Sequence, residues 1–188
     1  MDVLLGVFSA FGLSASAGLN AYIPLLIVGV LAHYTNLIQL KAPWDLLANP
    51  WILIMLGLLL IVEMLADKVP VVNHINDLIQ TLVRPAAGAI AFAASTNVVQ
   101  GVNPVLAMAC GLLVAGSVHL VKSAAVRPLV TATTGGAGNV PVSVVEDLTS
   151  TVVSFLSILV PVAIAVLAAI IILVLLWWWA RRRHAVAT

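Results

Sequence analysis

Charged side chains are scarce in this sequence, and their scarcity excludes most classes of soluble protein. Asp, Glu, Lys and Arg make up only 8% of the 188 residues, whereas 63% are hydrophobic and the mean hydropathy is +1.19. A soluble domain of this size could not bury so much apolar surface. The sequence therefore predicts an all-α protein, a single integral membrane domain over residues 1–188 with the lipid bilayer as its solvent.

Other absences narrow the function. The single cysteine, Cys110, excludes an intrachain disulfide. No basic patch with interleaved aromatic residues is present, so nothing indicates nucleic-acid binding. The Ser-His-Asp order, HExxH and CxxC are all missing, and no Walker-type Lys follows the glycines. We therefore expect neither an enzyme nor a bound cofactor.

Long hydrophobic runs predict a transmembrane helical bundle with about five main crossings. The runs cover residues 2–35, 49–67, 75–95, 103–122 and 143–180. Three of them contain prolines that predict kinked or broken helices, near Pro24, at Arg84-Pro85 and at Pro161. We expect residues 123–142, which are rich in Gly and Thr, to form a long irregular connection, either external or re-entrant.

The two ends of the chain predict its orientation. The first hydrophobic run, residues 2–35, lacks the basic start of a signal peptide, so we expect it to be retained in the membrane. Three tryptophans at residues 177–179 are typical of a membrane interface, and the basic tail of residues 181–188 begins directly after Ala180 with three arginines. Because cytoplasmic flanks are enriched in Lys and Arg, we expect a cytoplasmic C-terminus.

Two parts of the sequence also resemble each other. A shift of 54 residues lays Asn49-Pro50 on Asn103-Pro104 and Lys68 on Lys122, and a shift of 61 lays Pro24 on Pro85. We interpret this as an internal duplication. Repeat A covers about residues 20–83 and repeat B about 84–154, with a C-terminal helix to residue 180. Repeats of interrupted helices are typical of transporters with a site at the repeat interface, and the pattern leaves parallel and inverted repeats open.

Ionisable residues concentrate in residues 63–85, between apolar runs. Such groups are costly at bilayer depth and persist where they pair or line a watery path. Glu63 and Asp67, four residues apart, share a helix face, and with Asp77 they are candidate ligands for a hard cation or carriers of a proton. Asp77 and Arg84 lie on one polar stripe, and we expect Arg84, Lys68 or Lys122 within salt-bridge reach of Asp77. Solvated helix-end charges and a purely structural Asp–Arg pair are the alternatives.

Polar residues in the second half of the chain are candidates for binding either an anion or a cation. His119 and Lys122 share a face and suit an anion or a proton, although a packing histidine is the simpler interpretation. Beside Arg127, the glycine-rich segment could present N–H groups to an anion or oxygens to a cation, or be a flexible loop. Glu146 and Asp147 have a simple explanation as favourable charges near a helix start. The candidate ion-binding residues are Glu63, Asp67, Lys68, Asp77, Arg84, His119, Lys122, Arg127, Thr134, Asn139 and Asp147, of which Glu63, Asp67 and Asp77 are the candidate metal ligands.

Four stretches, LNAYIPLL, EMLADKVPVVNHINDLIQTLVRP, TTGGAGN and SVVEDL, together resemble a family of small bacterial integral membrane proteins defined only as a domain of unknown function. The resemblance covers nearly the whole chain and implies a multi-pass protein of the bacterial inner membrane. Glu63-x-x-x-Asp67-Lys68 resembles the Glu-x-Gly-Asp-Lys signature of small cation/proton exchangers, with the spacing off by one and Ala66 in place of Gly. Arg84-Pro85-Ala-Ala-Gly88 is similar to the re-entrant motif of polyprenyl-phosphate translocases.

Three hypotheses follow. The first is a transporter for a small ion, a cation in preference to an anion, in which the carboxylates bind and the basic residues compensate them. The second is a lipid-phosphate translocase, with Arg84, Lys122 and Arg127 on the headgroup. The third is a scaffold or assembly factor that transports nothing. Two small-residue faces would permit a homodimer; they comprise Gly12, Ala15 and Gly18, and Ala87, Gly88 and Ala91.

Overall fold

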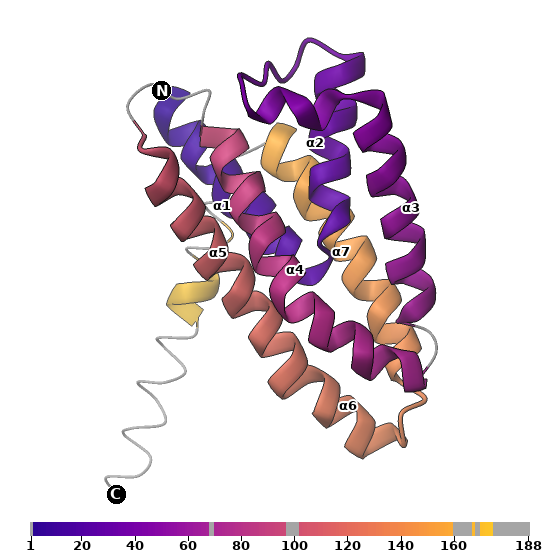
Figure 1. The fold of residues 1–188 in the computed structure, drawn as a ribbon. Coiled ribbons are helices and arrows are strands. Elements are labelled where there is room, and N and C mark those ends of the chain that lie inside the picture. Colours follow the sequence, from indigo (N-terminus) through magenta and orange to yellow (C-terminus); the bar gives the residue numbers. More distant parts are fainter. Residues whose placement is uncertain (1, 68–69, 97–101, 160–166, 168–169, 175–188) are drawn as a thin grey trace, which may run out of the picture.

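The computed structural model describes residues 2–67, 70–96, 102–159, 167 and 170–174, and within them the regular elements are all helical (Figure 1). The expected kink at Pro161, the tryptophan belt, the basic tail and the side chains of Lys68 and His74 lie outside the described residues. The elements are α1 (Asp2–Leu19), α2 (Tyr22–Tyr34), the 3-10 helix η1 (Trp44–Ala48), α3 (Pro50–Ala66), α4 (Pro70–Thr96), α5 (Pro104–Val121), the π-helical turn η2 (Lys122–Val126), α6 (Arg127–Thr134) and α7 (Asn139–Leu159).

The helices have the length and apolarity of membrane spans. Asn76–Thr96, Pro104–Thr134 and Asn139–Leu159 are each long and apolar enough to cross a bilayer, and the shorter helices Gly6–Leu19, α2 and α3 are apolar too. Large apolar side chains cover the outside: Trp51 is 79% exposed and Leu82 is 78% exposed. The chain is thus a helical membrane protein, and the predicted fold class is confirmed.

Two helices begin with the same local chemistry. The Asn49 side chain accepts a hydrogen bond from Trp51 N and caps α3, and the Asn103 side chain accepts one from Val105 N and caps α5. Each cap is followed by a proline in the first turn, where a missing N–H costs nothing. Both helix starts are where the sequence predicts them. The duplication that they suggest stays a prediction.

The first hydrophobic run is broken, as its polar residues predict. Asn20 and Ala21 separate α1 from α2, and the Asn20 side-chain oxygen accepts hydrogen bonds from Tyr22 N and Ile23 N at 3.1 Å each. Asn20 therefore satisfies the first free N–H groups of α2. A helix interruption inside a membrane is tolerated only where the protein buries it, and Asn20 is 1% exposed.

Two expected interruptions differ from the structure. A kinked or broken helix was predicted at Arg84-Pro85, and the break is excluded because α4 continues through Pro85. The prediction of an irregular connection over residues 123–142 is wrong: η2 and α6 extend α5 as one rod to Thr134 (Figure 1). Pro128 follows the π turn at the start of α6, where proline is compatible with a helix. Only Gly135 and Gly136, with φ of 62° and 92°, turn the chain.

Small residues bring α1, α4 and α5 into close contact. A side chain at Gly88 would overlap Ala115 of α5, and one at Gly18 would come within 2.6 Å of the Ala115 carbonyl oxygen. The small-residue faces expected to permit a homodimer are therefore used inside the bundle. Ala91, for example, is completely buried there. Their use inside one chain removes the argument that they gave for a dimer.

Candidate functional site

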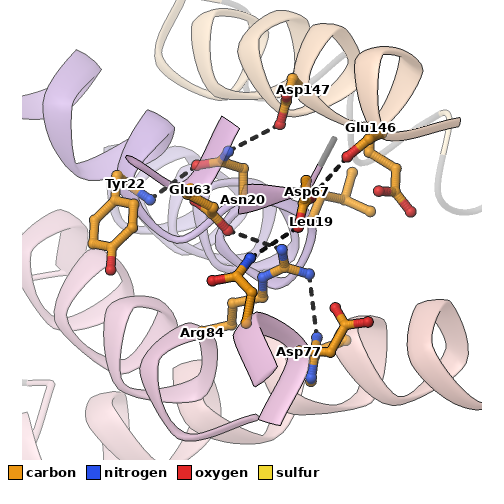
Figure 2. Close-up of polar contacts among 12 residues, drawn as sticks. Leu19, Asn20, Tyr22, Glu63, Asp67, Asp77, Arg84, Glu146 and Asp147 are labelled. Atoms are coloured by element: carbon orange, nitrogen blue, oxygen red, sulfur yellow. Dashed lines mark hydrogen bonds and ion pairs between the residues drawn. The ribbon is translucent and has the colours of Figure 1, made fainter. Parts of the chain in front are cut away.

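Seven ionisable side chains from α3 and its C-cap, α4, the α5–α6 rod and α7 meet beside the α1–α2 break. We call them the charged cluster: Glu63, Asp67, Asp77, Arg84, Lys122, Arg127 and Glu146. Figure 2 labels Glu63, Asp67, Asp77, Arg84 and Glu146 among them. Arg84 is completely buried, and Glu63, Lys122 and Arg127 are 2%, 3% and 5% exposed. Charges so deep in a membrane protein require partners or a function.

The first part of the cluster is a hydrogen-bonded chain across three helices. Arg84 Nη2 on α4 donates to Glu63 Oε1 on α3 at 2.8 Å, and its Nη1 lies 3.2 Å from His119 Nδ1 on α5. A guanidinium only donates, so Nδ1 accepts and the imidazole proton lies on Nε2. That N–H donates to Thr81 Oγ1 at 3.2 Å, whose hydroxyl donates to the Asp77 carbonyl. His119 is therefore a neutral link between Arg84 and Thr81.

The second part depends on the π turn. Lys122 and Arg127 are five residues apart, which in a regular α-helix places them about 140° apart around the axis. In η2, Arg127 N donates to Lys122 O, the five-residue spacing of a π-helix, and both side chains reach α7. Lys122 Nζ lies 2.7 Å and Arg127 Nη2 3.2 Å from the same atom, Glu146 Oε2. The inserted residue thus brings two cations onto one carboxylate.

Asp67 has a complete set of donors. Arg127 Nη2 lies 3.0 Å from its Oδ2, Ser143 Oγ donates to the same oxygen at 2.7 Å, and Asn76 Nδ2 donates to Oδ1 at 2.8 Å. Arg127 Nη1 also lies 3.8 Å from Asp77, whose side chain is 22% exposed. Asp67 is therefore held from three directions, whereas among the described residues Asp77 has one ion pair, at 3.8 Å.

Two carboxylate oxygens in the cluster have no hydrogen-bond partner among the described residues. They are Glu63 Oε2 and Asp77 Oδ1, and both atoms are buried. A buried acceptor left unsatisfied costs about 1–3 kcal/mol, more for a charged group. In the described part of the chain the cluster contains four carboxylates and three basic groups. Arg84 Nε also lacks a partner among the described residues, so unsatisfied groups of both signs are present. The excess of carboxylates over basic groups favours a proton or a cation as the further ligand.

The sequence predicted much of this set but not its pairing. Asp77 was expected to pair with Arg84, Lys68 or Lys122. Among the described residues its basic partner is Arg127, while Arg84 binds Glu63. The metal site expected from Glu63, Asp67 and Asp77 is not assembled, because the described side chains include no group of three or more His, Cys, Asp or Glu suited to a metal ion.

Three other candidates lie outside the cluster. Thr134 and Asn139 are in the turn between α6 and α7, where Thr134 Oγ1 accepts from Gly138 N and Asn139 Nδ2 donates to Thr131 Oγ1. These bonds are local and exposed, so they stabilise the turn. Asp147 forms no ion pair with the cluster among the described residues; its Oδ1 accepts a hydrogen bond from Asn20 Nδ2 at 2.9 Å (Figure 2).

Glu146 was missed, because it was interpreted as a charge near a helix start. The helix begins at Asn139, so Glu146 lies two turns inside α7. The sequence does contain a signal for it: polar residues follow one another at spacings of 3, 4, 4 and 3 from Ser143 onward, which places them on one helix face. The buried face of α7 consists of Ser143, Glu146, Ser150, Ser154 and Ser157. Ser150 and Ser154 bond to Ser16 at 2.7 and 2.6 Å and join α7 to α1.

Comparison with known proteins identifies a family but no activity. No curated protein and no solved structure matches the chain. Residues 7–182 match the family described as Domain of unknown function (DUF4126), a match that covers nearly the whole sequence. Since it extends across the α1–α2 break and every helix of the charged cluster, the chain belongs to this family of unknown function.

Proposed function

We propose that this protein is a membrane transporter for a small ion, and that the ion is a cation. The observation that carries the proposal is the buried charged cluster, in which Glu63 Oε2 and Asp77 Oδ1 lack hydrogen-bond partners within the described residues. Two unsatisfied carboxylate oxygens favour a positively charged ligand. Glu63 and Asp77 would bind the ion. When no ion is bound, Arg84 would compensate the charge of Glu63 and Arg127 that of Asp77.

The position of the cluster also supports transport. It lies beside a helix interruption, and Lys122 Nζ donates to the carbonyl oxygen of Leu19, the last residue of α1, at 3.1 Å. Interrupted helices with their ends at a charged site are typical of secondary transporters. A cation arriving at Glu63 would compete with Arg84 for the same carboxylate. Binding and release of the ion would thereby be linked to the pairing of α3 with α4.

The same geometry gives less support to lipid-phosphate translocation. A phosphate would need free guanidinium or ammonium groups. Arg84 is engaged by Glu63, Lys122 by Glu146, and Arg127 by Asp67 and Glu146. A scaffold function would use these pairs only to hold helices together. The two unsatisfied carboxylate oxygens, Glu63 Oε2 and Asp77 Oδ1, do not fit a purely structural role, because a cluster with every polar atom paired would stabilise the fold more.

Flux through purified protein in liposomes tests the proposal. We expect wild-type protein to carry Na⁺, K⁺ or H⁺. Asp77→Asn should fold, because the side chain is partly exposed and its ion pair is long, but it should lose most flux. Glu63→Gln should lose it as well. Asp45→Asn is the control for charge, because Asp45 is an exposed acidic residue of η1.

Three results would overturn the proposal. Stable, monodisperse Asp77→Asn and Glu63→Gln variants with full flux would place the ion path elsewhere. Absence of cation flux together with transfer of a polyprenyl-phosphate between leaflets would favour the lipid hypothesis. Absence of both, with a partner protein co-purifying, would favour a scaffold.

We further propose that the protein resides in a bacterial inner membrane with its C-terminus in the cytoplasm, since three arginines follow three tryptophans near that end. A C-terminal fluorescent-protein fusion should be bright, and a C-terminal alkaline phosphatase fusion should be inactive, because each reporter works on one side only. The opposite pair of results would reverse the orientation of every helix.

A further inference from the structure

A second site lies beside another face of α7, about 100° around the helix from the cluster residue Glu146. A groove of about 360 Å³ runs between α2, α3 and α7. Its walls are almost entirely apolar and include Ile27, Leu60 and Phe155, and its polar lining comes from Asp147 and Thr151. Leu148 and Phe155, which also line it, are 62% and 42% exposed on the apolar outer surface. The groove is therefore accessible from the lipid.

The charge of Asp147 is poorly compensated there. Its Oδ1 accepts a hydrogen bond from the neutral Asn20 Nδ2, and none of the described residues that line the groove is basic. Lys122, whose field reaches Asp147, is held by Glu146 at 2.7 Å and by the Leu19 carbonyl. A carboxylate in apolar surroundings favours a ligand with a positive charge.

We propose that this groove binds an amphiphilic organic monocation that enters from the membrane. The apolar body of the ligand lies against α2, α3 and α7, and its ammonium group binds Asp147. Pockets that hold small ligands begin at about 300 Å³ and combine apolar walls with a few placed polar groups. This groove has that size and composition.

The carboxylate is also preorganised. Asn20 donates to Asp147 through its amide nitrogen while its amide oxygen caps α2, so both ends of the Asn20 side chain are fixed. A fixed acceptor loses little freedom when a ligand binds. The proposal does not rest on ion transport through the charged cluster, since Glu146 and Asp147 point about 100° apart on α7 and have different partners. Glu146 pairs with Lys122 and Arg127, whereas Asp147 accepts from the neutral Asn20.

Equilibrium binding of radiolabelled decyltrimethylammonium to the full-length protein in phosphatidylcholine nanodiscs tests this proposal. We expect saturable binding that unlabelled ligand displaces and that decanol, with the same chain and no charge, displaces poorly. Asp147→Asn should weaken binding at least tenfold. Thr151→Trp should weaken it comparably by filling the groove, which keeps the test valid should Asp147→Asn fail to fold. Glu63→Gln and Asp45→Asn should bind like wild type.

Saturable binding that is lost in both groove variants would establish the site, whatever the flux measurements show. The proposal is overturned if binding is not saturable, if folded Asp147→Asn and Thr151→Trp both bind like wild type, or if decanol competes as well as the cation. A loss of binding in Glu63→Gln protein that is folded and monodisperse would also overturn it, because it would place the cation in the charged cluster.

Discussion

Replacing Arg84 with methionine should lower the free energy of unfolding by about 3–5 kcal/mol, because it leaves the Glu63 charge buried without its cation. Arg84 is completely buried and Glu63 is 2% exposed, so neither charge reaches solvent in the folded state. Methionine retains much of the apolar stem, which limits the packing change. The variant also removes the donor to His119 Nδ1. Reversible unfolding in mixed micelles measures the loss.

A double-mutant cycle separates the ion pair from packing. Arg84→Met combined with Glu63→Gln should recover a large part of the stability lost in Arg84→Met, since the double variant has no unpaired charge in this pair. Asp45→Asn, on an exposed residue, should change stability by less than about 0.5 kcal/mol. Equal stabilities of Arg84→Met and wild type would show that Glu63 is protonated or otherwise compensated in the folded protein.

Adding one methyl group at Gly88 should destabilise the protein by about 1–3 kcal/mol. The new Cβ would overlap Ala115 Cβ and lie 2.8 Å from the Gly111 carbonyl oxygen, so α4 and α5 would have to separate. Backbone atoms of α5 cannot rotate away as a long side chain can. Unfolding of Gly88→Ala in the same micelles measures the cost.

Gly57→Ala is the matched control for Gly88→Ala. Gly57 also lies inside a helix, α3, but a Cβ there would meet no atom within 4 Å. Alanine is a better helix former than glycine, so Gly57→Ala should be neutral or stabilise by up to about 1 kcal/mol. Opposite signs for the two variants would confirm the close approach of α4 and α5. Equal effects would mean that these helices lie further apart.

The sequence predicts best where the chemistry is local. The starts of α3 and α5 follow from Asn49-Pro50 and Asn103-Pro104 because a cap and its proline act within one turn. The buried polar residues of residues 63–85 follow from the cost of charge in an apolar run. Both arguments need only neighbouring residues and the solvent.

Pairing between helices could not be predicted in the same way. Arg127 reaches Asp67 and Glu146 because η2 inserts a residue into the rod, and nothing in Lys122 to Val126 distinguishes a π turn from an ordinary one. Glycines at 135, 136 and 138 suggested an irregular segment from residue 123 onward, yet the helix continues to Thr134 and the chain turns only after it. The partner of Asp77 depends on that same turn.

The break at Asn20 creates two helix ends of opposite polarity inside the bundle. The free carbonyl of Leu19 at the negative end of α1 accepts from the ammonium of Lys122. At the positive end of α2, Asn20 connects the first N–H groups to the Asp147 carboxylate. The basic Lys122 is therefore bound at the negative end of α1, and the acidic Asp147 is linked to the positive end of α2. An uninterrupted helix over residues 2–34 would remove both ends and leave one cation and one carboxylate less well compensated.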